Sequence, residues 1–301
     1  MKNPKVRQVV LPLITAMIWG SSFVTQSLSA GHLGCFSFNA LRSIPAALAL
    51  LLLLLVVRRI RPREKYTAEE KRALLRGGLI CGFFLTLGVN LQQFGIETTT
   101  AGKAGFITAL YIVLVPMIGL ALGRRTGWLV WAAVAVAIGG LWFLCVPPEG
   151  FSVRLGDLYT LLCAFVFSLH ILVISHFVTK VNGVELACGQ FVCGSIIASA
   201  AVLIAESPTI EGLQGALLPI LWAGIMSNGI AYTLQIVGQR GMNETVASLI
   251  MSLESAIAVI AGWLLLGEVL SQRELFGCVL MAGAVVLAQL PAPKSRHSGK
   301  D

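Results

Sequence analysis

A few ionisable side chains stand inside long apolar stretches of the sequence, and these residue types are suited to binding chemistry. Glu254 lies near the middle of the stretch 245–266, and Arg42 lies early in the stretch 34–57. A charged group at the centre of a bilayer costs roughly 2.5–3.5 kcal/mol, so such groups usually face a cavity or a partner. Glu254 could bind a cationic group or exchange a proton, or it could be a neutral, hydrogen-bonded packing residue. Arg42 could hold a carboxylate in a bidentate fork, pair with Glu254 or Glu97, or extend toward the membrane surface.

Further polar side chains occupy equivalent places in the two halves of the chain. Sliding the sequence along itself gives an offset of 148 residues near the start of each half and of 143 further on, because the intervening loops differ in length. The polar residues paired by these offsets are Ser22 with His170, Arg42 with Gln190, Gln92 with Gln235, and Tyr111 with Glu254. Polar groups at symmetry-related positions suit a binding site at the midplane of a two-part membrane protein. We therefore predict a substrate site built from Glu254, Arg42, Tyr111, Gln92, Gln235, His170 and Gln190.

Several of these residues also have a structural interpretation. A single histidine in a packed helix is commonly a satisfied structural group, although His170 could also relay protons. The glutamines Gln92, Gln190 and Gln235 could instead hydrogen-bond neighbouring helices without touching a ligand. Both interpretations are compatible with the sequence.

Ten apolar stretches must position these side chains. The 301 residues are 56% hydrophobic and only 12% charged, whereas a soluble domain is about 25% charged. A helix of about 20 apolar residues crosses the hydrocarbon core. The expected spans are 9–29, 34–57, 74–96, 100–122, 126–146, 156–178, 184–205, 215–238, 245–266 and 272–290. They are continuous apolar runs rather than short alternating segments, which excludes a β-barrel and predicts an all-α integral membrane protein.

The last five spans repeat the pattern of the first five. A unit with an odd number of spans is turned over when it is copied in tandem, so we predict two inverted five-helix repeats. The first repeat is assigned to residues 1–147 and the second, with a basic cytoplasmic tail, to residues 148–301. Many secondary transporters have two such halves that meet at the bilayer midplane.

The basic residues are distributed unevenly between the two sides of the membrane. Three of them, Lys103, Arg154 and Arg273, fall on one side. The eighteen on the other side are Lys2, Lys5, Arg7, Arg58, Arg59, Arg61, Arg63, Lys65, Lys71, Arg72, Arg76, Arg124, Arg125, Lys180, Arg240, Lys294, Arg296 and Lys300. This bias predicts a multi-pass protein of the cell membrane with both termini in the cytoplasm. The net charge of +8 is then a feature of topology and of contact with anionic lipid, and no nucleic-acid partner is expected.

Short motifs stand in a characteristic order along almost the whole chain. They are WGSSF at 19–23, Arg42, TTTAGKAGF at 98–106, LES at 253–255 with LLLGE at 264–268, and GCVLMAG at 277–283. In this order they resemble the EamA family of the drug/metabolite transporter superfamily. The resemblance implies a ten-helix fold of two inverted repeats that moves small organic solutes, often outward. Where that family often has proline after the intramembrane glutamate, this chain has Ser255.

Three classes of function suit a helical membrane protein of this kind. A P-loop is absent from the sequence, so direct ATP drive by this chain is not expected. An intramembrane lipid-modifying enzyme would need a catalytic cluster, but HExxH and GxSxG are absent and aspartate occurs only at Asp157 and Asp301. A channel-like facilitator would need a continuous polar pore lining rather than a few midplane groups.

We therefore predict a secondary transporter, not an enzyme, that works by alternating access. Its expected substrates are small polar metabolites, with amino acids or related amines as the class suggested by an acidic and a basic group in one site. Export is the expected direction and protons are a candidate coupling ion. With no CxxC pair and no histidine cluster, we expect neither a metal nor a cofactor, and we expect a monomer or a weak dimer.

Glycine and proline add two expectations about helix geometry. The GxxxG spacings of Gly78 with Gly82 and of Gly119 with Gly123 predict close approach of neighbouring helices. The prolines inside expected spans, which predict local kinks, are Pro45, Pro116 and Pro219.

Overall fold

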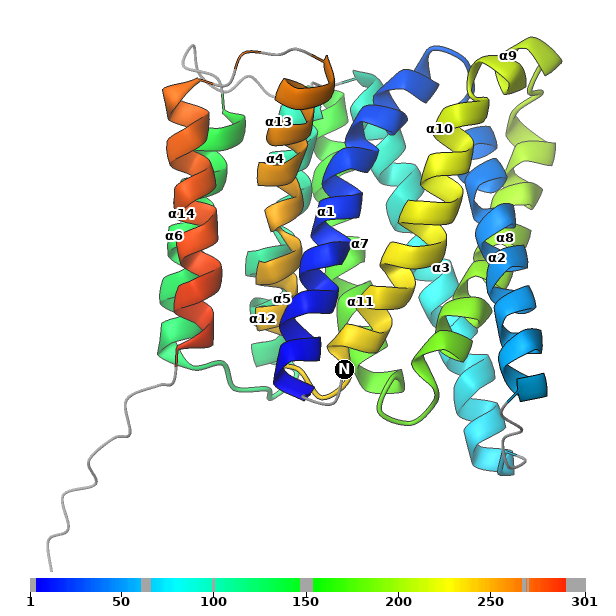
Figure 1. The fold of residues 1–301 in the computed structure, drawn as a ribbon, viewed down its shortest axis with the longest axis horizontal. Helices are drawn as coiled ribbons and strands as arrows, with labels where there is room; N and C mark the ends of the chain where they lie inside the picture. Colours follow the sequence, from blue (N-terminus) through cyan, green and yellow to red (C-terminus); the bar gives the residue numbers. More distant parts are fainter. Residues whose placement is uncertain are drawn as a thin grey trace, which may run out of the picture.

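The computed structural model describes residues 4–60, 66–98, 101–146, 154–266, 269 and 271–290, and all regular structure in these ranges is helical (Figure 1). The elements are α1 (Pro4–Ala30), α2 (Cys35–Ile60), α3 (Ala68–Thr98), α4 (Ala101–Ala109), α5 (Tyr111–Ala121), α6 (Trp128–Cys145), α7 (Leu155–Phe177), α8 (Gly183–Ala205), α9 (Ile210–Gly215), α10 (Leu217–Trp222), the π-helix η1 (Ala223–Ala231), α11 (Tyr232–Gln239), α12 (Glu244–Met251), α13 (Leu253–Leu266) and α14 (Gln272–Gln289). Parts of the motifs at 98–106 and 264–268, the basic residues within 61–65 and the tail after Leu290 lie outside the described residues.

Eight helical segments of the described chain are long and apolar enough to cross a membrane. They are Val6–Ala30, Cys35–Ile60, Ala68–Thr98, Ala104–Ala121, Leu155–Phe177, Gly183–Ala205, Leu217–Gln239 and Glu244–Ala261. Trp128–Leu144 is a further apolar helix of shorter length, and α14 covers the last expected span. Each expected span overlaps one helix or a run of consecutive helices, which confirms the prediction of an all-helical membrane protein.

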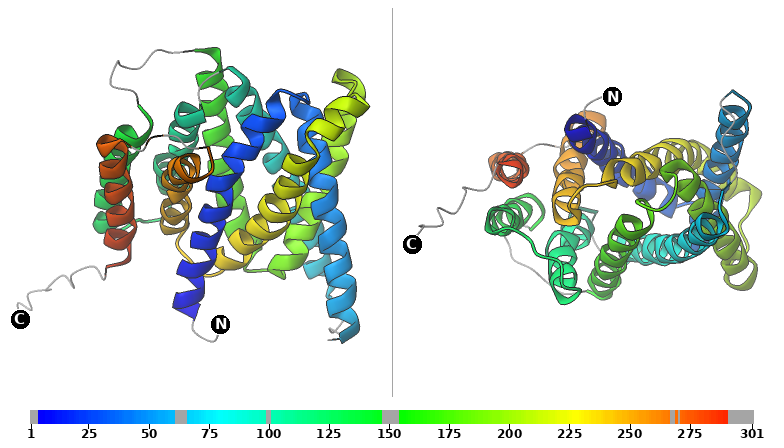
Figure 2. Two further views of the ribbon diagram at one scale, coloured as in Figure 1. Left: turned by 45° about the horizontal axis from the view of Figure 1, so that its top comes forward. Right: turned by 90° about the horizontal axis from the view of Figure 1, so that it is seen from below.

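The helices form one bundle, and a pair of helices lies at each end of its longest axis, which is horizontal in Figure 1. At one end α6 lies beside α14, and at the other α2 lies beside α8 (Figures 1 and 2). Between these pairs, α7 packs against α3 on one side and against α4 and α5 on the other. In the same manner α1 packs against η1 and α11 on one side and against α12 and α13 on the other. The helices α1 and α7 therefore lie between the two pairs and have matching neighbours.

Two of the expected spans are each interrupted at one residue. The span 100–122 breaks at Leu110, between α4 and α5, and the span 245–266 breaks at Ser252, between α12 and α13. The backbone angles at the breaks are nearly the same, with φ −59° and ψ −9° at Leu110 and φ −64° and ψ −11° at Ser252. The Ser252 hydroxyl donates to the carbonyl oxygen of Leu249 at 2.9 Å, and a serine that bonds the preceding turn in this way competes with the helix ladder. The interruption thus forms without the proline that the related family often carries after the glutamate.

The span 215–238 is also not a uniform α-helix. It runs through α10, η1 and α11, and Pro219 lies four residues before η1 begins at Ala223. Proline cannot donate a backbone hydrogen bond and disturbs the ladder of the preceding turn, and π-turns concentrate at functional sites. By contrast, Pro45 and Pro116 lie inside α2 and α5 without ending them.

Only one of the two GxxxG pairs brings helices together. A Cβ atom added to Gly78 would lie 3.1 Å from the Cα atom of Gly189, and one added to Gly82 would lie 2.7 Å from the carbonyl oxygen of Gln190. These glycines therefore allow α3 to pack closely on α8.

The expectation for Gly119 and Gly123 was wrong. Gly123 has φ +78° and no neighbour that an added Cβ atom would meet within 4 Å. The amide of Arg124 donates to the carbonyl oxygen of Gly119 and that of Gly123 to the carbonyl oxygen of Leu120, each at 2.9 Å. This is a Schellman ending, in which glycine adopts the left-handed conformation, so the spacing serves the end of α5 rather than helix packing.

Candidate substrate site

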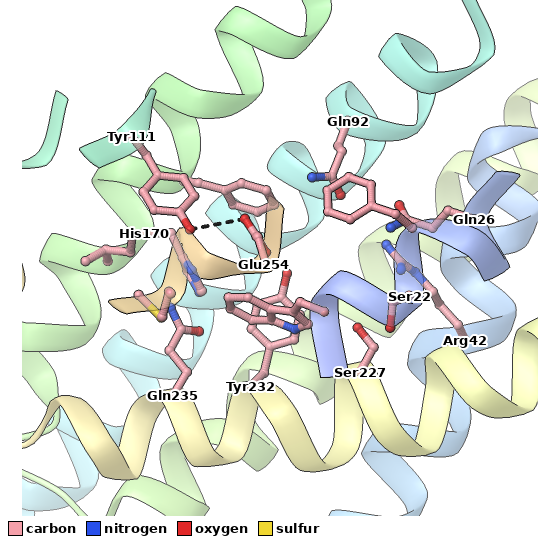
Figure 3. Close-up of a pocket in the computed structure, with 15 residues that line it drawn as sticks. Ser22, Gln26, Arg42, Gln92, Tyr111, His170, Ser227, Tyr232, Gln235 and Glu254 are labelled. Atoms are coloured by element: carbon pink, nitrogen blue, oxygen red, sulfur yellow. Dashed lines mark hydrogen bonds between the residues drawn. The ribbon is translucent and has the colours of Figure 1, made fainter. Parts of the chain in front are cut away.

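A cavity with about 520 Å³ of empty space lies in the bundle between the two halves of the chain. Helices from both halves contribute its walls, namely α1, α2, α3 and α5 from the first and α7, η1, α11, α12 and α13 from the second. The lining residues are Trp19, Ser22, Phe23, Gln26, Arg42, Gln92, Tyr111, Phe167, His170, Ile171, Ser227, Tyr232, Gln235, Met251 and Glu254 (Figure 3).

The acidic part of the cavity centres on Glu254, which is 5% exposed. The hydroxyl of Tyr111 donates to Oε1 of Glu254 at 3.1 Å. The break at Ser252 places Glu254 in the first turn of α13, where the positive end of the helix dipole favours a carboxylate. Gly20 lets α1 approach this turn, because a Cβ atom at position 20 would lie 2.7 Å from the carbonyl oxygen of Glu254. The WGSSF motif and the intramembrane glutamate are thus in direct contact.

The basic part of the cavity is Arg42, which is 3% exposed and therefore does not extend to the membrane surface. Its Nε donates to Oδ1 of Asn39 at 2.8 Å, and its guanidinium lies 5.1 Å from the centre of the Phe38 ring. Within the described ranges, Nη1 and Nη2 make no hydrogen bond. In the view of Figure 3, the guanidinium lies beside Gln26, with Gln92 nearby.

Arg42 and Glu254 line the same cavity without forming an ion pair. No ion pair of the described residues includes either of them, so the expected alternative of Arg42 pairing with Glu254 or Glu97 was wrong. In Figure 3 Glu254 lies with Tyr111 and His170 on one side and Arg42 on the other. The cavity therefore holds two buried groups of opposite charge type, each available to a ligand.

His170 and Gln190 contact each other, but only His170 lines the cavity. His170 lines it, whereas Gln190 is fully buried outside the lining and lies 3.1 Å away, from its Oε1 to Nε2 of His170. Gln190 is thus linked to the cavity through His170, and its predicted part in substrate binding stays a prediction. The other predicted members, namely Glu254, Arg42, Tyr111, Gln92, Gln235 and His170, all line the cavity.

Aromatic rings form much of the remaining wall. The rings of Trp19 and Tyr232 lie 4.6 Å apart between centres, and His170 meets Tyr232 edge-on at 6.2 Å. Phe191 supports Tyr232 from behind at 5.7 Å. Trp19 packs against both large hydrophobic clusters of the protein, and its buried Nε1 has no hydrogen-bond partner among the described residues. Aromatic faces of this kind attract cationic groups as well as apolar ones.

Several lining residues were not predicted from the sequence. Trp19, Ser22, Phe23 and Gln26 follow the spacing i, i+3, i+4, i+7 of one helical face. Of these four, the repeat had singled out only Ser22, as the counterpart of His170. Tyr232 was missed because its counterpart at the offset of 143 is the apolar Val89. Ser227 faces the cavity from the π-helix, whose period cannot be read from the sequence pattern.

Among the residues that the structure describes, no three or more His, Cys, Asp or Glu side chains gather as ligands would. The six cysteines whose side chains are described are all free thiols.

The sequence of this chain matches the model of a known protein family twice. The model of the EamA-like transporter family matches residues 7–146 and again residues 154–290. The chain belongs to this family. The resemblance drawn from the short motifs is thereby confirmed, and the family is one of transporters. With its apolar helices, the chain is a multi-pass membrane protein of this family.

Individual relatives cover nearly the whole EamA-like chain. A protein of Archaeoglobus fulgidus named an uncharacterized transporter is 29% identical over 92% of this chain and 84% of its own length. The threonine/homoserine exporter RhtA of Escherichia coli strain K12 is 28% identical over 94% of this chain and 89% of its own. A crystal structure with 15% identity has a TM-score of 0.75 and covers 94% of this chain and 96% of the other, which shows a shared fold.

Proposed function

We propose that this EamA-like protein is a secondary transporter that exports zwitterionic amino acids or related amines by alternating access. The observation that carries the proposal is the pair of buried groups Arg42 and Glu254, which line one cavity without pairing to each other. A free amino acid presents a carboxylate and an ammonium group at a short, fixed separation. Arg42 would bind the carboxylate through its unused Nη groups, and Glu254 would bind the ammonium.

The remaining lining residues suit the rest of such a substrate. Gln26, Gln92 and Gln235 offer amide groups for hydrogen bonds, and the side-chain oxygens of Gln26 and Gln235 are buried with no partner in the described part of the chain. The rings of Trp19 and Tyr232 offer an apolar wall for a side chain. Similarity to RhtA, whose name describes export of threonine and homoserine, supports both the substrate class and the outward direction.

We further propose ten membrane-spanning helices in two inverted repeats, with α6 and α14 as the fifth of each. Three observations support this arrangement. The neighbours of α1 match those of α7, the breaks at Leu110 and Ser252 have nearly the same geometry, and the family model matches two successive segments. We place the boundary between the two repeats between residues 147 and 148.

Alternating access requires contacts that separate during the cycle. Arg58 pairs with Glu185 at 3.2 Å, and Arg124 pairs with Glu244. Both pairs join the first half to the second at the end of the bundle where the N-terminus lies (Figure 1). We propose that this end faces the cytoplasm and that these pairs break when the cavity opens inward. A single chain encloses the cavity, so a monomer would suffice.

The experiment that tests the function is comparative profiling of culture medium. Cells overproducing the native protein are compared with cells producing Glu254→Gln at matched membrane levels. The proposal predicts that one or more amino acids or amines accumulate outside only with the native protein. Purified protein in liposomes then identifies the direct substrate by counterflow of the same solutes, at several values of external pH to test proton coupling.

Each alternative gives a different result in these assays. An intramembrane enzyme would yield a chemically altered lipid or solute rather than an unchanged one. A channel-like facilitator would dissipate a solute gradient without showing counterflow. Native protein that neither changes the medium nor exchanges any amino acid or amine in liposomes would overturn the proposal.

A further inference from the structure

A buried network of amides lies behind the Arg42 guanidinium, on the side away from the cavity. Asn39 is fully buried on α2, one turn before Arg42, and Asn90 on α3 is 7% exposed. Neither asparagine lines the cavity. Oδ1 of Asn39 accepts from Nε of Arg42 at 2.8 Å, and Nδ2 of Asn39 donates to Oδ1 of Asn90 at 3.0 Å.

Each amide in this network has a hydrogen-bond partner that can only donate or can only accept. That partner determines which end of the amide is the oxygen and which is the nitrogen. Nε of Arg42 can only donate, so the atom of Asn39 that faces it must be the oxygen. The carbonyl oxygen of Val89 can only accept, and Nδ2 of Asn39 donates to it at 3.3 Å. The carbonyl oxygen of Thr86 likewise fixes Asn90, whose Nδ2 donates to it at 2.7 Å. The network therefore has one arrangement, and it holds Arg42 in one position.

The helix that carries Arg42 is also held in place on its other side. A Cβ atom added to Gly224 of η1 would lie 2.9 Å from the carbonyl oxygen of Arg42, so the π-helix packs directly on this turn of α2. Nδ2 of Asn228 donates to the hydroxyl of Ser43 at 3.4 Å. Both contacts involve the backbone or a neighbour of Arg42 and leave its guanidinium free.

All the groups that support Arg42 are neutral. An arginine that is buried in a protein interior is usually paired with a carboxylate, because an unpaired charge is costly there. Here the support is an amide, which orients the guanidinium through Nε and leaves its charge uncompensated. An anionic group inside the cavity could compensate this charge, because Nη1 and Nη2 make no hydrogen bond to the described residues.

We propose that Asn39 is a positioning residue that sets the charge selectivity of the site. Its neutral carboxamide, held by Asn90, presents the Arg42 guanidinium to the cavity with its full charge, so that a substrate carboxylate is required for tight binding. This inference rests on the proposed function, in which Arg42 binds the carboxylate. It adds that selectivity depends on a residue that does not touch the substrate.

The test replaces Asn39 by its charged isostere and compares two substrates. Asn39→Asp retains the acceptor for Nε of Arg42, and in its ionised form it supplies a carboxylate that neutralises the guanidinium. Its second oxygen then faces the carbonyl oxygen of Val89 and Oδ1 of Asn90, so the measurements are made at alkaline pH, where the carboxylate is ionised. Native and variant proteins are reconstituted in liposomes, and KM is measured for an amino acid that the native protein exchanges, such as threonine, and for the amino alcohol that lacks its carboxylate. We expect the KM for the amino acid to rise about tenfold or more, the usual effect of losing a charge-assisted contact, with little change for the amino alcohol.

A matched control separates selectivity from damage to the fold. Gln239→Glu buries a new carboxylate at the end of α11, where Gln239 is 1% exposed and outside the cavity lining. It should leave the ratio of the two KM values unchanged even if it lowers the amount of folded protein. Because the measured quantity is a ratio between two substrates of one preparation, a partly unfolded sample does not imitate the expected result.

The outcomes distinguish this inference from the proposed function. Native protein that exchanges no amino acid contradicts the proposed function and the inference together. Native protein that exchanges amino acids while Asn39→Asp keeps the native ratio of KM values contradicts the inference alone. A variant that loses both substrates equally, with a normal yield of folded protein, would show that Asn39 has only a structural role.

Discussion

The hydroxyl of Tyr111 donates a hydrogen bond to Oε1 of Glu254, and the two residues lie 143 positions apart. That number is the second of the two offsets at which the second half of the sequence repeats the first. Two residues that are equivalent in different repeats can touch only where the repeats meet. At the acidic part of the cavity, therefore, the two halves meet through equivalent positions, directly after the breaks at Leu110 and Ser252.

Removing the charge of Glu254 should weaken binding of the substrate ammonium without disturbing the fold. Glu254→Gln keeps an acceptor for the Tyr111 hydroxyl, so the helix contact survives. We expect KM for an exchanged amino acid to rise about tenfold or more, measured by counterflow in liposomes. Tyr111→Phe is the companion variant and should have a smaller effect, because the carboxylate remains. Unchanged kinetics and unchanged pH dependence in Glu254→Gln would contradict a role for this residue in binding or coupling.

Replacing Arg42 by lysine should impair recognition even though the charge is kept. Lysine lacks the planar fork and the Nε that Asn39 orients, so the ammonium would not be aimed at the carboxylate. We expect KM for the amino acid to rise about tenfold, whereas the corresponding amine should be affected little. Equal kinetics for Arg42→Lys and native protein would indicate that only net charge matters at this position.

Gly20 should tolerate no side chain. A Cβ atom there would lie 2.7 Å from both the Glu254 carbonyl oxygen and a methyl carbon of Ile257, so Gly20→Ala must push α1 away from α13. Overpacking of this kind costs about 1–3 kcal/mol, visible as a lower melting temperature in detergent and reduced exchange. Gly139→Ala on α6 is the control, because nothing lies within 4 Å of its added Cβ. A melting temperature of Gly20→Ala at or above that of Gly139→Ala would be inconsistent with the close contact.

The orientation in the membrane can be tested with single cysteines on opposite ends of the bundle. Arg72 on α3 and Glu211 on α9 are both exposed, and each is replaced by cysteine in a chain whose native cysteines have been removed. The charge bias predicts that an impermeant maleimide labels position 211 in intact cells and position 72 only after the membrane is opened. The reverse pattern would overturn the assignment of both termini to the cytoplasm.

Much of the site was accessible from the sequence because a charged or amide side chain in lipid has few structural alternatives. Glu254, Arg42, Tyr111, Gln92, Gln235 and His170 were found through their polarity and their matching places in the two halves, and all line the cavity. Gln190 satisfied the same criteria and lies outside it, bound to His170. Polarity and periodicity identify a residue that needs a partner, but they do not distinguish a ligand from a neighbouring helix.

The sequence by itself determined the class of protein, the approximate helices and the family, because the hydrocarbon core demands long apolar helices and short motifs survive in order. Only the tertiary structure decided which partners the polar groups choose. Arg42 is held by Asn39 rather than by a carboxylate, Ser227 reaches the cavity from a π-helix, and Trp19 meets Tyr232 across more than two hundred residues of chain. These choices depend on helix rotation, local breaks and packing between distant segments, which no one-dimensional pattern specifies.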